Sequence, residues 1–204
     1  LETVRDLGWK MPGVVVVPSG NLGNVYALYL GFDLVRRLGV VRGPLPRLVA
    51  AQASAADPLH RARVKGWPAR PEPVTAGDTI ATAIRIGSPV SFKRAVFAIG
   101  ESKGTTTTSS ERRIVEGMRV LDRQGLLACP QTGAAVDGVR QLFEAGFVKK
   151  GERVVVVSTA SGLKFSEAKA AVETNRPISV AARVEAVVDA LDVPARPSSR
   201  GSAA

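Results

Sequence analysis

The sequence predicts an α/β fold with a largely parallel sheet flanked by helices. Residues 14–17 and 154–157 are short, unbroken valine runs, which is typical of strands that are buried on both faces. Residues 47–51 form a third apolar run of strand length. A glycine-containing turn and a segment of helical periodicity lie between the first run and residues 47–51. This order of strand, turn, helix and strand indicates a βαβ unit, the building block of parallel sheets.

The elements of the first half follow in order. Residues 21–38 carry apolar side chains at helical spacing, and Gly39 is placed to end that helix. Residues 57–77 are rich in proline and glycine and are expected to form a loop with short helical pieces. Residues 79–86 are predicted to form a short helix.

In the second half, further helices are predicted at residues 91–99, 109–124 and 132–145, the last one after the break at Pro130. Residues 153–158 are predicted to be a third buried strand. From Pro194 the chain contains mostly Pro, Ser, Arg, Gly and Ala, a composition typical of disorder. We therefore expect a domain over residues 1–193 and a disordered tail over residues 194–204.

The composition excludes several kinds of site. The single cysteine, Cys129, excludes an internal disulfide or a cysteine metal cluster, and the single histidine, His60, excludes a histidine-rich metal site. No metal is therefore expected. Cys129 is interpreted as a small buried thiol, and His60 as a surface residue in a loop. No apolar run approaches the ~20 residues that a membrane-spanning helix needs, so no membrane association is expected.

The chain carries a net charge of +10. Such a charge can indicate a nucleic-acid partner. However, the basic residues are scattered, and aromatic residues, which stack on bases in single-strand binders, make up only 5% of the chain. We therefore expect a small anionic substrate and no nucleic acid. The chain begins with Leu1 instead of Met, so an upstream segment is expected.

The turn after the first strand has the composition of an anion-binding loop. Backbone N–H groups at the start of a helix lack intrahelical partners, and the helix dipole favours negative charge there. Glycine allows close approach of an anion and positive φ angles, and asparagine can donate to phosphate or cap the helix. The alternative is an ordinary βα turn in which the asparagines only cap. The residues concerned are Gly20, Asn21, Leu22, Gly23 and Asn24.

This loop and several later motifs resemble a known family. Residues 17–24, Val-Pro-Ser-Gly-Asn-Leu-Gly-Asn, are similar to the loop that binds the cofactor phosphate in threonine synthases. These are fold-type II pyridoxal-phosphate enzymes, related to the tryptophan synthase β subunit. The resemblance extends over residues 9–169 and is strongest to the plant-type branch. It continues in order through residues 46–49, 52–53, 56–59, 79–91, 129–133 and 157–165.

The resemblance implies a fold, a cofactor and a reaction. The chain would be part of the large domain of a fold-type II enzyme that converts O-phospho-L-homoserine and water to L-threonine and phosphate. Its cofactor would be pyridoxal 5′-phosphate, held by Gly20 to Asn24. Thr159 resembles the residue whose hydroxyl meets the pyridine nitrogen, although a strand-end hydroxyl in a local turn is the alternative. A homodimer is one expected assembly, in the cytoplasm or, in a plant or alga, in a plastid.

The sequence also departs from the family. Ser19 stands where the family usually has another glycine, and Gln131 and Ser161 stand where plant-type members commonly have histidine. The lysine that forms the Schiff base with the cofactor lies in the N-terminal half of these enzymes, and no lysine here matches its motif. We therefore expect no catalytic lysine in this chain and no activity from the chain alone. The alternatives are another fold-type II enzyme, such as a threonine dehydratase or cysteate synthase, and a truncated non-catalytic homologue.

Overall fold

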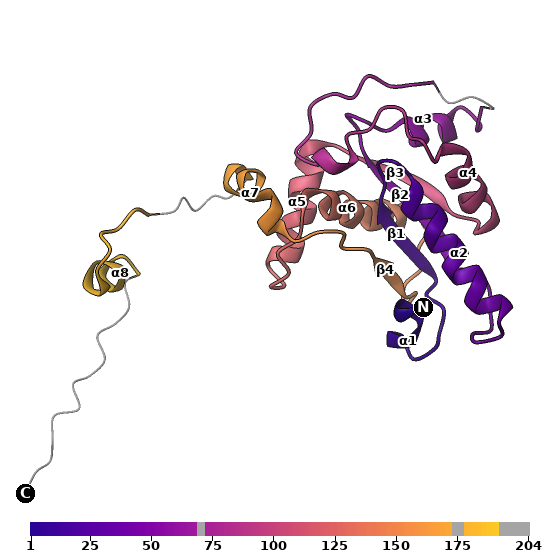
Figure 1. Cartoon of the computed structure of the whole chain (residues 1–204), viewed down its shortest axis with the longest axis horizontal. Coiled ribbons are helices and arrows are strands. Elements are labelled where there is room, and N and C mark those ends of the chain that lie inside the picture. Colours follow the sequence, from indigo (N-terminus) through magenta and orange to yellow (C-terminus); the bar gives the residue numbers. More distant parts are fainter. Residues whose placement is uncertain (69–71, 173–177, 192–204) are drawn as a thin grey trace, which may run out of the picture. The chain divides into compact units, whose positions relative to one another are not determined.

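The computed structural model describes residues 1–68, 72–172 and 178–191. The chain divides into two units, Leu1–Lys169 and Ala170–Ala204. The first unit contains the sheet and the helices packed on it (Figure 1). The described part of the second unit includes helix α8 (Val184–Ala190), in which no residue is buried. The predicted disordered tail, residues 194–204, lies outside the described residues.

A parallel four-stranded sheet forms the centre of the first unit. The strand order is β3-β2-β1-β4, and every neighbouring pair is parallel. The prediction that the three apolar runs form neighbouring parallel strands is therefore confirmed. The strands are β1 (Val14–Pro18), β2 (Arg47–Ala53), β3 (Thr105–Ser109) and β4 (Val154–Val156).

Two features of the sheet differ from the prediction. Strand β3 was not predicted, because its sequence of four threonines and a serine lacks an apolar run. Threonine is β-branched and favours extended backbone, and here the threonines pair with β2 and are mostly buried. Strand β4 is only half-buried, against the prediction of a buried strand. It pairs with β1 alone and forms one edge of the described sheet.

Helices cover both faces of the sheet (Figure 1). On one face Val15 and Val17 pack with helices α2 and α4, and on the other Val14 and Val16 pack against helix α6. Alternate valines therefore enter different cores, which explains why the run is continuous. The helices are α2 (Gly23–Arg37), α3 (Pro58–Val64), α4 (Phe92–Glu101), α5 (Glu111–Asp122) and α6 (Pro130–Glu144).

Short elements complete the unit: α1 (Glu2–Asp6), the 3-10 helices η1 (Thr82–Ile84) and η2 (Gly162–Phe165), and α7 (Ser166–Val172), which crosses the boundary between the two units. The predicted helix at residues 79–86 is wrong apart from the single turn η1. Its backbone donors use side-chain acceptors instead of a helical ladder: Ile80 N–H donates to Glu111 Oε2, and Ala81 N–H donates to Thr79 Oγ1. No helix in the described chain is long and apolar enough to cross a membrane.

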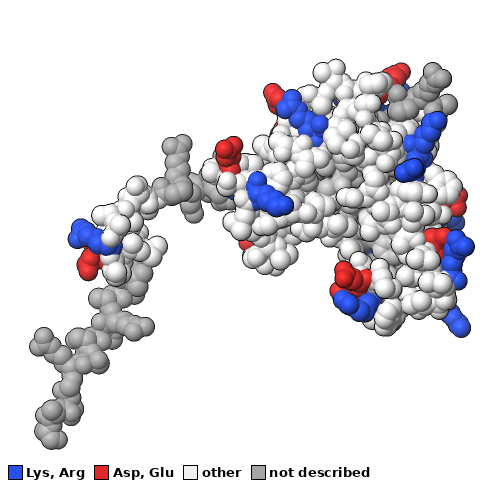
Figure 2. Space-filling model, in the orientation of Figure 1, with Lys and Arg blue, Asp and Glu red and all other residues white. Residues whose placement is uncertain are grey.

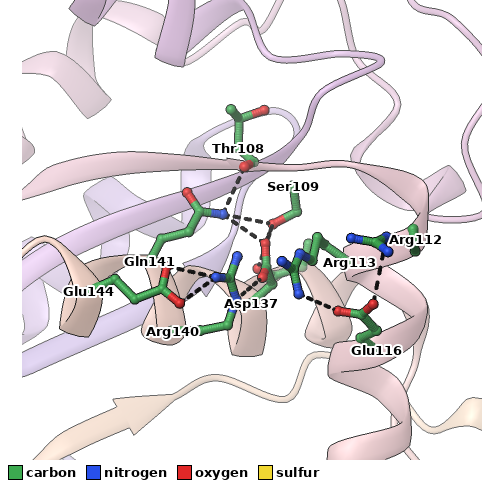
Figure 3. A network of polar contacts seen from close by, with 10 residues as sticks. Thr108, Ser109, Arg112, Arg113, Glu116, Asp137, Arg140, Gln141 and Glu144 are labelled. Carbon is green, nitrogen blue, oxygen red and sulfur yellow. Dashed lines mark hydrogen bonds and ion pairs between the residues drawn. The ribbon is translucent and has the colours of Figure 1, made fainter.

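A buried polar network ties α6 to β3 (Figure 3). The Asp137 carboxylate accepts hydrogen bonds from Ser109 Oγ at 2.7 Å, Gln141 Nε2 at 2.7 Å and Arg140 Nε at 2.8 Å. Gln141 Nε2 also donates to the carbonyl oxygen of Thr108 at 2.8 Å. The three donors compensate for the cost of burying this charge. The network therefore fixes the position of α6 beside the sheet.

Candidate functional site: a cavity at the carboxyl ends of the strands

A cavity of about 350 Å³ lies beside the turn that follows β1. Its walls combine this turn with segments distant in sequence, and none of the described lining residues carries a charge. Ligands of parallel α/β sheets bind outside the carboxyl ends of the strands, which is where this cavity lies. The lining residues are Pro18, Ser19, Gly20, Asn21, Leu22, Gly23, Asn24, Ala83, Ile84, Ile86, Gln131 and Thr159.

All six predicted site residues line this one cavity. Gly20 to Asn24 follow β1, and Thr159 follows β4, the parallel neighbour of β1. The structure therefore brings the loop and Thr159 together at the same edge of the sheet. That arrangement is what the sequence predicted. Their role as ligands of a cofactor stays a prediction.

The loop leaves the start of α2 uncapped. Leu22 is the N-cap residue and makes no side-chain capping hydrogen bond. The Asn21 side chain does not cap the helix either, because its Oδ1 accepts from Val90 N–H at 3.3 Å. The N–H groups of the first helical turn have no intrahelical partners. The positive end of α2 is thus available to an anion in the cavity.

The positive φ angle in the loop belongs to Leu22, at 68°, and to neither glycine. The sequence assigned this conformation to glycine. A non-glycine residue is strained there, by about 1–3 kcal/mol. Leu22 is only 2% exposed and packs into the core that contains α2, and this burial offsets the strain.

The two glycines have different functions in the structure. A Cβ atom on Gly20 would lie 2.9 Å from Ile84 Cα and 3.0 Å from the Ala83 carbonyl oxygen, so Gly20 allows the segment around η1 to pack on the loop. A Cβ atom on Gly23 would meet only Ser91 Oγ, at 3.8 Å. A side chain at position 20 would therefore push this segment away from the loop and destabilise the fold. At position 23 the space next to the backbone is free for a ligand.

Thr159 is exposed, and its hydroxyl lies near the start of α6. The Thr159 Oγ1 atom is 3.7 Å from Cys129 Sγ, which in turn is 3.1 Å from Thr132 Oγ1. Cys129 is fully buried, in agreement with its interpretation as a buried thiol. Its only described polar neighbours are hydroxyl groups, so it has no acid or base to activate it.

Gln131 is a site residue for which the sequence predicts no role. It is 2% exposed, lines the cavity, and neither polar atom of its side chain has a hydrogen-bond partner in the described structure. The only signal in the sequence was its departure from the family's histidine. Ser161, the second such departure, has a local role, since its Oγ accepts from Leu163 N–H at 3.2 Å and begins η2.

A larger hollow, of about 540 Å³, lies beside α3 and is lined in part by His60, Arg61 and Lys65. It is not the better candidate, because it contains neither predicted motif. His60 was expected at the surface in a loop, which is wrong. It lies in α3, half-buried, with its Nδ1 3.0 Å from Thr106 Oγ1. Burial lowers the pKa of His60, against an opposing effect of the nearby Asp57 carboxylate.

The surface charge is divided into separate groups. On the face shown in Figure 2, lysine and arginine side chains are isolated or stand beside acidic ones, with wide uncharged areas between them. Among the described residues as a whole, independent of this view, Arg36 forms an ion pair with Asp33, and Arg140 with Glu144. The described residues on this face therefore form no continuous basic strip along which a polyanion could lie.

Residues 1–160 match the sequence pattern of the pyridoxal-phosphate-dependent enzymes. This match covers most of the chain. The chain belongs to this family. The predicted cofactor, pyridoxal phosphate, is therefore confirmed as the cofactor of the family.

Several individual proteins similar to the chain are threonine synthases. Chloroplastic threonine synthase 2 of Arabidopsis thaliana is 38% identical over 202 residues, which cover 94% of this chain and 39% of that protein. The threonine synthase of Methanocaldococcus jannaschii is 35% identical over 171 residues, 82% of this chain and 41% of that protein. The chain thus spans about 40% of the length of these relatives. The resemblance to threonine synthases is confirmed.

Solved structures of the family share the fold. Threonine synthase from Escherichia coli matches with a TM-score of 0.62 at 22% identity, over 85% of this chain and 37% of that one. The L-serine ammonia-lyase from Rhizomucor miehei matches with a TM-score of 0.64 at 16% identity, over 81% and 53%. At these identities the likeness concerns the fold, which is that of fold-type II pyridoxal-phosphate enzymes.

The residues of the cavity fit pyridoxal phosphate. The uncapped start of α2 offers backbone N–H donors to a phosphate in the cavity, and no described lining residue carries a carboxylate that would repel it. The free space beside Gly23 permits close approach to the backbone. The volume, about 350 Å³, is within the range of ~300–1,000 Å³ typical of ligand pockets.

Proposed function

We propose that this chain forms the cofactor-phosphate side of the active site of a threonine synthase, which converts O-phospho-L-homoserine and water to L-threonine and phosphate. One observation carries the proposal: the uncapped start of α2 and Thr159 line the same cavity. Relatives named threonine synthase, 35% and 38% identical to the chain, support the choice of reaction. The enzyme would be a lyase of amino-acid biosynthesis.

Each part of the cavity has a role in this proposal. The N–H groups at the start of α2 would hold the phosphate of the cofactor, and Asn21 and Asn24 line the same cavity. Bound pyridoxal phosphate supplies an electron sink for the substrate. Thr159 Oγ1 would donate a hydrogen bond to the ring nitrogen and so hold that nitrogen unprotonated, which would moderate the sink. Ile84 and Ile86 form an apolar wall that excludes water.

The lysine that links covalently to the cofactor is proposed to lie outside this chain. None of the described residues that line the cavity is a lysine. Lys169 and Lys65 are engaged elsewhere, with Asp122 and Glu72. The 204-residue chain alone should therefore produce no threonine, and full activity requires the segment that carries this lysine.

A product assay tests the proposal. The chain would be joined behind the N-terminal part of the Arabidopsis relative and supplied with pyridoxal phosphate and O-phosphohomoserine. We expect threonine and phosphate in equal amounts from the fusion and none from the chain alone. In a parallel reaction supplied with threonine, formation of a 2-oxo acid would instead indicate a dehydratase. A soluble fusion that binds the cofactor but forms no product would support the non-catalytic alternative.

A further inference from the structure

Two helices direct their N-termini at the same cavity. The first is α2, through Gly23 and Asn24, and the second is α6, through Gln131 in its first turn. Like α2, α6 begins without a side-chain capping bond, since its N-cap residue is Cys129 and the thiol does not cap. Both helices have 15 residues. Their positive ends together favour an anion in the space between them.

Gln131 is the second and independent sign of a ligand at this place. An amide side chain has two donors and two acceptor positions, and burying it without hydrogen-bond partners is unfavourable. Gln131 is 2% exposed with both Nε2 and Oε1 unpaired. The other buried side-chain amide among the described residues, Gln52, is paired: its Nε2 donates to the Ser19 carbonyl oxygen, and its Oε1 accepts from His60 N–H.

The position of Gln131 is fixed by the packing of α5 on α6. A Cβ atom on Gly133 would lie 2.4 Å from the Ile114 carbonyl oxygen, and one on Gly117 would lie 2.2 Å from the Gly133 carbonyl oxygen. The two helices therefore cross in near-contact two residues after Gln131. Because this contact holds α6 in place, a shift of the helix cannot carry the Gln131 side chain out of the cavity.

We propose that Gln131 is a ligand-binding residue of this cavity, whose Nε2 donates a hydrogen bond to a phosphate oxygen of the bound ligand. The inference rests on the proposed function, because it takes that ligand to be the phosphorylated cofactor. The ligand completes the hydrogen bonding of the amide, and the ligand-free chain carries the cost of leaving it unpaired. Gln131 thus lowers the folding stability of the ligand-free chain and raises its affinity for the ligand.

The test compares Gln131→Leu with Gln141→Leu, which makes the same substitution in the same helix at an amide whose Nε2 is paired, with the Thr108 carbonyl oxygen and Asp137. Affinity is measured by calorimetry for pyridoxine 5′-phosphate, pyridoxine and inorganic phosphate, and stability by the thermal midpoint without ligand. Pyridoxine 5′-phosphate has no aldehyde and cannot react with surface lysines. Gln131→Glu keeps the shape of the side chain and replaces the donor by a negative charge.

We expect Gln131→Leu to bind pyridoxine 5′-phosphate about 10- to 100-fold more weakly, as expected for the loss of one charge-assisted hydrogen bond. Affinity for inorganic phosphate should fall with it, whereas that for pyridoxine should not change. Gln131→Glu should bind the two phosphates more weakly still. Without ligand, the thermal midpoint of Gln131→Leu should rise by about 2–4 °C. Gln141→Leu should show the reverse, a lower midpoint with parental affinity.

Two results would overturn the inference. Parental affinity of Gln131→Leu for pyridoxine 5′-phosphate would show that the amide does not touch the phosphate, while the cofactor site itself would stand. Failure of the parent chain to bind either phosphate would remove the cofactor site, and the role of Gln131 with it. The two failures are therefore distinguishable by the behaviour of the parent.

Discussion

Replacement of the two loop glycines separates folding from ligand binding. Gly20→Ala places a Cβ atom 2.9 Å from Ile84 Cα, a backbone atom that cannot move without displacing the segment around η1. Gly23→Val places a side chain where the nearest atom is Ser91 Oγ, 3.8 Å from the added Cβ. The first substitution is therefore expected to destabilise the fold. The second is expected to leave the fold intact and to obstruct the ligand.

The magnitudes follow from these contacts. Overpacking of a well-packed site costs about 1–3 kcal/mol, and each kcal/mol lowers the midpoint of a domain of this size by about 2–4 °C. Gly23→Val should change the stability by less than about 1 kcal/mol, since valine is no worse than glycine in a helix. If it prevents two hydrogen bonds to the phosphate, worth about 1.5–3 kcal/mol each, the affinity should fall a hundredfold or more.

The assay combines thermal unfolding with calorimetric titration of pyridoxine 5′-phosphate for the parent and both variants. We expect a lower midpoint for Gly20→Ala only, and a large loss of affinity for Gly23→Val at nearly the parental midpoint. If Gly23→Val binds the ligand as tightly as the parent, the loop is an ordinary turn and the reasoning is refuted.

Three further predictions concern single residues. Thr159→Val in the complete enzyme should retain most of the cofactor affinity and lower kcat, measured by phosphate release; an equal loss of both would contradict a contact to the ring alone. Because the pKa of His60 is lowered, the unfolded chain binds the proton more tightly, so the stabilising effect should be fully present above about pH 6.5 and decrease as the pH falls below it. His60→Gln should therefore make the free energy of unfolding, measured with urea, less dependent on pH in this window. A variant with the parental pH dependence would exclude His60 as the cause. Asp137→Ala should lower the free energy of unfolding by about 3 kcal/mol or more, because Ser109 and Gln141 lose their charged acceptor. Glu144→Gln, at the exposed end of the network, should lower it by less than about 1 kcal/mol. Similar unfolding free energies for the two variants would refute the importance of the buried carboxylate.

Much of the sheet could be predicted because its central strands have one strong signal. The four valines of β1 enter two different cores, so the run is apolar without alternation, and β2 is similar. Strand β3 could not be found in this way. Its threonines are polar by composition, and they become strand residues only because β2 offers them a parallel partner. Tertiary context therefore decided the assignment.

The candidate site was predictable as far as local composition determines it. The loop and Thr159 follow strands, and parallel pairing brings strand ends together. The segment around η1 was taken for a helix, because its acceptors at Glu111 and Thr79 are side chains that no periodicity reveals. Gln131 was seen only as a departure from a family pattern. Its unpaired amide is a property of the packing of α6 against its surroundings, which the sequence does not display.

The central claim is that the N–H groups of Gly20 to Asn24 bind the phosphate of the cofactor. The most direct measurement is an NMR titration of the isotope-labelled chain with pyridoxine 5′-phosphate, in which every backbone amide is followed separately. We predict the largest shift changes at residues 20–24, with the same amides responding to inorganic phosphate and little response to pyridoxine. Unchanged amides at residues 20–24, with shifts confined to lysines elsewhere on the surface, would contradict the account.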